Sequence, residues 1–325
     1  MSPYQLNKTI SIGIPLLFLL CCLSIFDFNN PSLWWLLIIV AHTLGYTHFI
    51  LGYLYQYRSL KRVSDKKSLQ IFYVLTLVAI LFSLIFIFTN LFPLLAVIAI
   101  GYFIFHGVLN EVTQMKEFMD ISPRVSDLIP LLFYLLTFFL FSLMHPSFFF
   151  TPELVFLNPT PDMAVTMMNQ IISTKFIHIL AIVCAVLFFI TMPGKLFFQG
   201  RFLASLVIAT VAISTFGILF YMQPLSYVFL YFLALSYHFI SWGVFILQKF
   251  LQRAPERIPQ YVLAHVYILV PLSALLVLLI GNVPTVNSLQ IFIFNGVIFV
   301  VMAMIHNTTS LLNEDWFKKI IKQYV

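Results

Sequence analysis

The sequence predicts an all-α, polytopic integral membrane protein, a helical bundle of about ten transmembrane helices with both termini cytoplasmic. Of its 325 residues, 62% are hydrophobic and only 9% are charged. Apolar stretches of about 20 residues recur along the chain, and a helix of that length crosses a hydrocarbon core roughly 30 Å thick. Because no segment is long and polar enough for a soluble domain, residues 1–325 are expected to form a single transmembrane domain.

Loops rich in proline or charge separate the predicted helices. Basic stretches follow the second, fourth, sixth and eighth helices, whereas Pro93 and Pro224 mark the two shortest connections. The long connection 145–174 is rich in proline and phenylalanine and is expected to lie against the membrane surface. In chain order, the predicted helices are 10–27, 33–55, 69–91, 93–114, 128–149, 174–193, 201–222, 224–248, 259–281 and 287–312.

The basic residues predict the same topology independently, because lysine and arginine accumulate in cytoplasmic loops. All but Lys175 of the 17 basic residues fall on one side of the membrane when both termini are cytoplasmic, with Lys8 placed before the first helix. The net charge of +6 is therefore a topology signal, and nucleic acid is not an expected partner. Membrane lipids are expected partners, in an inner (plasma) membrane that the chain crosses many times.

The three cysteines lie inside predicted helices without CxxC or finger spacing, so neither disulfides nor a thiolate metal site is expected. The segment 10–27 lacks a basic flank and a small-residue cleavage site, so we interpret it as a retained helix rather than a signal peptide.

Histidines inside the predicted helices are the main indication of function. An ionisable side chain in hydrocarbon costs a few kcal/mol, so several at one depth indicate a shared partner such as a metal ion. Counting from the helix ends at about 1.5 Å per residue places five of them at similar levels. These five candidate metal ligands are His48, His106, His238, His306 and His265.

Helical spacing predicts the surroundings of two of these histidines. Gly45 and Gly52 share a face with His48, which allows close approach of a neighbouring helix or a bulky ligand. His42 lies on another face of the same helix, as a possible second wall of the cavity. Trp242 shares a face with His238. His42 and Trp242, together with Asn110, are the candidate cofactor-binding residues.

His106 shares its face with Tyr102 and Asn110, and Glu111 is the only acid inside a predicted helix apart from Asp27, the last residue of 10–27. Three roles are open for Glu111: a metal ligand, an acceptor that orients a histidine N–H, or a residue at the cytoplasmic water boundary. Glu111 and Tyr102 are the candidate catalytic side chains.

Imidazole suits iron, copper and zinc, which leaves three classes of function open. The first is a non-haem iron oxygenase that acts on an apolar substrate. The second is a b-type haem protein that transfers electrons. The third is a transporter or channel that uses intramembrane histidines and Glu111. Non-haem iron is the cofactor we favour, with haem, copper and zinc as alternatives; the oligomeric state is not predicted.

Four short windows resemble one known family: Gly-Tyr-Thr-His48-Phe, His106-Gly-Val-Leu-Asn-Glu111, Tyr-His238-Phe-Ile-Ser-Trp and Ile-His306-Asn. They look like the Brp/Blh family of membrane β-carotene 15,15'-dioxygenases. The sequence departs from that pattern, because Thr precedes His48 where the family has Pro, and Ala234 stands where a second histidine would fall. The resemblance implies an iron-dependent membrane dioxygenase with histidine ligands and a lipophilic, carotenoid-like substrate.

Overall fold

The computed structural model describes residues 2–26, 31–62, 66–89, 92–119, 226–280 and 296–313, together with seven single positions between 179 and 190. These residues are helical almost throughout, and no strand occurs among them, as the all-α prediction requires. The predicted helices 128–149 and 201–222 lie outside the described residues, and so does most of 174–193.

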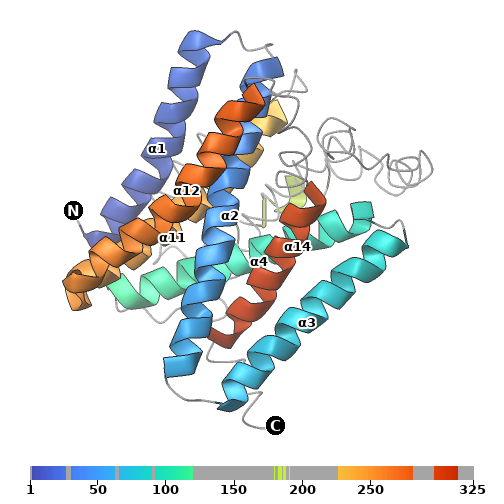
Figure 1. Cartoon of the computed structure of the whole chain (residues 1–325). Coiled ribbons are helices and arrows are strands. Elements are labelled where there is room, and N and C mark those ends of the chain that lie inside the picture. The colour runs from blue at the N-terminus through green and yellow to red at the C-terminus, as the bar shows by residue number, and fades with distance from the viewer. Residues whose placement is uncertain are drawn as a thin grey trace.

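The helices of the amino-terminal part are α1 (Pro3–Ile25), α2 (Pro31–Arg62), α3 (Lys66–Phe88) and α4 (Phe92–Met119). Those of the carboxy-terminal part are α11 (Ser226–Arg253), α12 (Ile258–Ile280) and α14 (Gly296–Ser310). Short 3-10 turns, η1 (Pro255–Arg257) and η2 (Leu311–Asn313), precede α12 and follow α14. Figure 1 shows α4 running crosswise to α2, with α3 and α14 on one side and α1 on the other.

The first helix begins earlier than its hydropathy predicts. Helix α1 starts at Pro3 rather than at residue 10 because Ser2 forms a capping box with Gln5. The Gln5 backbone N–H donates to Ser2 Oγ at 3.2 Å, and the Ser2 N–H donates to Gln5 Oε1 at 3.0 Å. The extra turns carry Lys8 into the helix, so the placement of this residue ahead of the membrane-spanning segment was wrong.

Among the described residues, three helices are long and apolar enough to cross a membrane: Pro3–Ile25, Lys66–Phe88 and the stretch Pro255–Leu275. They present large apolar side chains outward, among them Leu17 on α1, Ile85 on α3 and Val270 on α12. Such faces are costly in water and favourable in hydrocarbon, which is typical of a membrane protein.

Helices α2, α4, α11 and α14, which carry His48, His106, His238 and His306, each pack against at least one of these apolar helices. Helix α11 packs against α1 and α2, and α14 packs against α2, α3 and α4. The largest buried apolar cluster joins α1, α2, α11 and α14 through side chains such as Leu19, Phe49, Phe232 and Phe299. This packing brings residues more than 200 positions apart into one buried site.

Candidate metal centre

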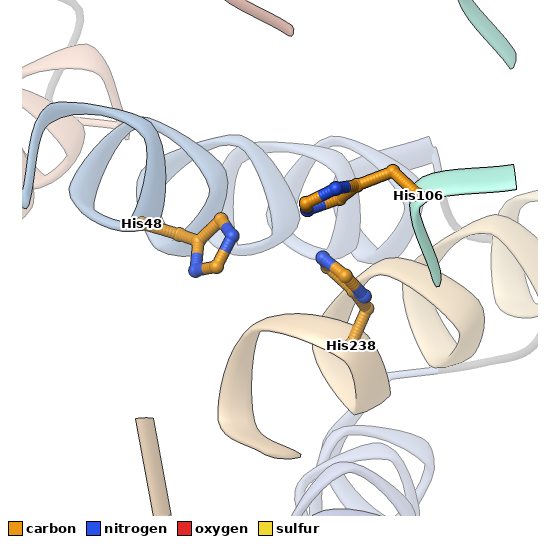
Figure 2. A group of neighbouring side chains, drawn as sticks. All are labelled: His48, His106 and His238. Atoms are coloured by element: carbon orange, nitrogen blue, oxygen red, sulfur yellow. The ribbon is translucent and has the colours of Figure 1, made fainter. Parts of the chain in front are cut away.

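Four histidines meet in the interior, each from a different helix: His48 from α2, His106 from α4, His238 from α11 and His306 from α14. All four are buried, with between 5% and 8% of each residue exposed. Figure 2 shows three of them, His48, His106 and His238, directed toward a common space between their helices.

The ring nitrogens of these residues lie close together. His306 Nε2 is 3.0 Å from His48 Nε2 and 3.2 Å from His106 Nε2. One ligand atom from each of His48, His106 and His238 lies within 4.8 Å of the others. A neutral ring nitrogen carries either one proton or one lone pair, so a simple hydrogen bond accounts for only one of the two contacts made by His306 Nε2.

The spacing fits adjacent ligands of a single metal ion. Imidazole nitrogens bound side by side at about 2.1 Å from a metal are roughly 3.0–3.4 Å apart, depending on the coordination geometry. Among the described residues, the buried His238 Nε2 has no hydrogen-bond partner, which leaves a nitrogen for coordination. The cluster can therefore hold a metal ion.

The glycines of α2 were predicted to leave room for a neighbouring helix or a bulky ligand, and in the structure side chains of α14 occupy that room. A Cβ on Gly52 would lie 2.7 Å from His306 Cε1 and 3.0 Å from His306 Nδ1. A Cβ on Gly45 would lie 2.5 Å from the ring of Phe299. Gly52 thus leaves the space in which the His306 imidazole reaches His48.

The substitution Gly52→Ala is expected to weaken metal binding while α2 stays helical. Alanine favours a helix by about 1 kcal/mol over glycine, but its methyl group must displace the His306 ring. Affinity can be measured by titrating the purified variant with Co²⁺. Gly13→Ala is the matched control, because no heavy atom lies within 4 Å of a Cβ at exposed Gly13. Equal affinities of the two variants would contradict the proposed packing.

Polar partners surround His106. Ser310 Oγ lies 3.0 Å from His106 Nδ1, and Asn110 Nδ2 lies 3.1 Å from His106 Nε2. Asn110 was predicted as a cofactor-binding residue, and the structure places it in contact with a candidate ligand. The contact of Ser310 was not predicted, although Ser310 lies one helical turn after His306.

Aromatic rings form the apolar walls of the cluster. The ring of His48 lies 5.1 Å from that of Phe239, and the ring of His238 lies 4.7 Å from that of Phe103, measured between centroids. Trp242, another predicted cofactor-binding residue, has its ring 6.5 Å from that of His48. The cluster is thus bordered by surfaces that suit an apolar ligand.

Three other predicted residues have contacts outside the cluster of His48, His106, His238 and His306. The ring of His42 stacks on Phe299 at 4.2 Å. The Nδ1–H of His265 donates to the Tyr261 carbonyl oxygen at 2.9 Å. Tyr102 packs against the apolar cluster that contains Met304. A ligand role for His42 and His265 and a catalytic role for Tyr102 stay predictions.

Glu111 is paired with a buried lysine. Lys8 Nζ donates to Glu111 Oε1 at 2.6 Å, and the hydroxyls of Tyr237 and Tyr4 donate to Glu111 at 2.7 and 3.1 Å. Glu111 is only 7% exposed, which does not fit the predicted alternative of a residue at the cytoplasmic water boundary. Lys8 was not predicted as the partner of Glu111, and the catalytic role of Glu111 stays a prediction.

The ammonium group of Lys8 has all of its hydrogen bonds satisfied by buried side chains. Its three N–H groups each have an acceptor, because Gln114 Oε1 at 2.9 Å and Ser241 Oγ at 3.1 Å complete the set with Glu111. Ser241 in turn donates to Asn7 Oδ1 at 3.0 Å. A stripe of polar residues at helical spacing on an otherwise apolar helix could have predicted this network. Its members are Tyr4, Asn7, Lys8 and Ser11.

Comparison with protein families, with characterised proteins and with solved structures found no match to this chain. Its function is therefore inferred from the site itself.

Proposed function

We propose that the protein is a membrane metalloenzyme in which His48, His106, His238 and His306 bind one non-haem iron, and that it acts oxidatively on a lipophilic substrate. The observation that carries this proposal is the convergence of four buried imidazoles from four helices, two of whose nitrogen contacts are 3.0 and 3.2 Å. Neutral imidazoles in an apolar interior need a common partner, and a divalent metal supplies it.

The nitrogen spacing favours a non-haem metal over haem. Two axial histidines of a haem iron stand on opposite faces of the porphyrin, with nitrogens about 4 Å apart at bonds of about 2 Å. In this protein the nitrogens of His48 and His306, and of His306 and His106, are closer than that. Ligands so close bind side by side, as they do on a metal with open positions.

The walls of the site favour an enzyme over a transporter. An ion path needs polar side chains that lead to and from the binding site. In the part of the chain that the structure describes, the rings of Phe49, Phe103, Phe239 and Trp242 border the histidine rings, and the polar partners Asn110 and Ser310 contact His106. Such walls fit a polyene or another apolar molecule that enters from the lipid.

The proposed reaction is cleavage of a carbon–carbon double bond by dioxygen, in line with the family resemblance. The C=C and O=O bonds break and two C=O bonds form, so both oxygen atoms end in the products and no further reductant is consumed. The metal, when bound, would supply the activation of dioxygen. The histidines would hold it, and the phenylalanines would keep water from the reacting bond.

We further propose that the chain crosses the inner membrane ten times with both termini in the cytoplasm. The alternation of basic loops supports this topology, and the three described helices of membrane-spanning length support a membrane location.

Oxygen uptake with a polyene tests the proposed activity. The protein, purified in detergent and loaded anaerobically with Fe²⁺, is expected to consume dioxygen when β-carotene is added, with loss of the visible absorption of the polyene. The same protein loaded with Zn²⁺ should leave β-carotene unchanged, because zinc has no redox chemistry. Iron-loaded protein that consumes no dioxygen with the polyene would refute the proposed reaction, and a strong Soret band would favour haem instead.

A further inference from the structure

We propose that Ser310 is a positioning residue that fixes the tautomer of His106, so that the Nε2 lone pair of His106 faces the metal. This inference rests on the metal site of the proposed function and adds a residue that orients one of its ligands. It follows from the position of one proton, that of the Ser310 hydroxyl, which lies close to both the Asn307 carbonyl oxygen and His106 Nδ1.

The first step concerns the single proton of the Ser310 hydroxyl. Ser310 Oγ lies 2.7 Å from the backbone carbonyl oxygen of Asn307, which can only accept a hydrogen bond. The hydroxyl proton is therefore used in that bond. Ser310 Oγ is also 3.0 Å from His106 Nδ1, so in this second contact it must accept, and His106 Nδ1 must carry the proton.

The opposite side of the ring agrees with this assignment. A neutral imidazole with a proton on Nδ1 has a bare Nε2. Asn110 Nδ2, an amide N–H donor, lies 3.1 Å from His106 Nε2, as expected for a nitrogen without a proton; a bound metal would take this lone pair in place of the amide. The same Nε2 faces His306 Nε2 at 3.2 Å, so its lone pair lies on the side where the histidines meet.

The other tautomer would block the site. With the proton on Nε2, an N–H would occupy the space where the metal must bind, and Nδ1 would face the serine oxygen without a proton between them. Partners that fix a ligand histidine in this way typically contribute 10- to 100-fold to metal affinity, so roughly that factor is expected to depend on Ser310.

Three variants separate the role of the Ser310 hydroxyl from a general effect on α14. Ser310→Ala removes the acceptor, and Ser310→Thr keeps it. Thr309→Val is the matched control, because it removes a neighbouring buried hydroxyl that bonds only to backbone carbonyl oxygens, those of Ile305 at 2.9 Å and His306 at 3.2 Å, and to no histidine ring among the described residues. The parent and each variant, labelled with ¹⁵N-histidine, are studied by NMR without metal and then titrated with Co²⁺.

The parent is expected to show His106 protonated on Nδ1, with its signals assigned by their loss in His106→Ala. Ser310→Ala should shift that population toward the Nε2–H form and lower Co²⁺ affinity by about 10- to 100-fold, whereas Ser310→Thr and Thr309→Val should resemble the parent. An Nε2–H tautomer in the parent, or equal losses of affinity in Ser310→Ala and Thr309→Val, would overturn the inference. If the parent bound no cobalt, the metal site would fail, while the metal-free tautomer would still decide the role of Ser310.

Discussion

Replacing His48, His106, His238 or His306 singly by alanine is expected to lower metal affinity by more than about 100-fold, because each change removes a direct ligand rather than a supporting partner. The variants should still insert into the membrane, since the apolar helices α1, α3 and α12 are unchanged. Metal content after purification, measured by elemental analysis with Fe²⁺ in the growth medium, checks the prediction.

A fifth variant, His42→Ala, tests the candidate cofactor-binding residue whose ring contacts Phe299 instead of the four-histidine cluster. His42 is as buried as the cluster, at 5% exposed, and lies on the same helix as His48, but its ring stacks on Phe299. We expect this variant to keep its metal. Metal content that is the same in all five variants and in the parent would show that the histidines do not form the site.

The second large effect is expected at the buried ion pair. Lys8→Met should lower the free energy of unfolding by about 3–5 kcal/mol, because the Glu111 carboxylate would stay buried without its counter-charge. The double variant Lys8→Met/Glu111→Gln should recover part of this loss, since a neutral amide can still accept from Tyr4 and Tyr237. Unfolding can be followed in mild detergent by titration with a denaturing detergent.

Lys61→Met is the control for a lysine outside such a network, because Lys61 is exposed on α2. Its effect should stay within about 0.5 kcal/mol. A Lys8→Met protein as stable as Lys61→Met would contradict the account of the network. So would a double variant less stable than Lys8→Met alone.

The all-α class and the meeting of four histidines could be predicted because both depend on periodicity. Apolar runs identify helices, and a count from their ends places His48, His106, His238 and His306 at one depth. A close contact on the His48 face of α2 was also predictable, since Gly45 and Gly52 leave room there for a neighbouring helix or a bulky ligand; that the neighbour is α14 was not.

The partners of these residues were not predictable, because they depend on which helices touch. Helix α1 begins at a capping box that a hydropathy window does not detect, so Lys8 was placed before the first helix and no counter-charge was predicted for Glu111. Ser310 and His106 are 204 positions apart, and only the packing of α14 on α4 shows that they form a hydrogen bond.

The most direct test of the account is X-ray absorption at the iron edge, recorded on the purified protein after loading with Fe²⁺. The account predicts one iron per chain with three or four imidazole nitrogens at about 2.1 Å and without the scattering pattern of a porphyrin. Protein that retains no iron, or iron in a porphyrin, would contradict a non-haem site built from His48, His106, His238 and His306.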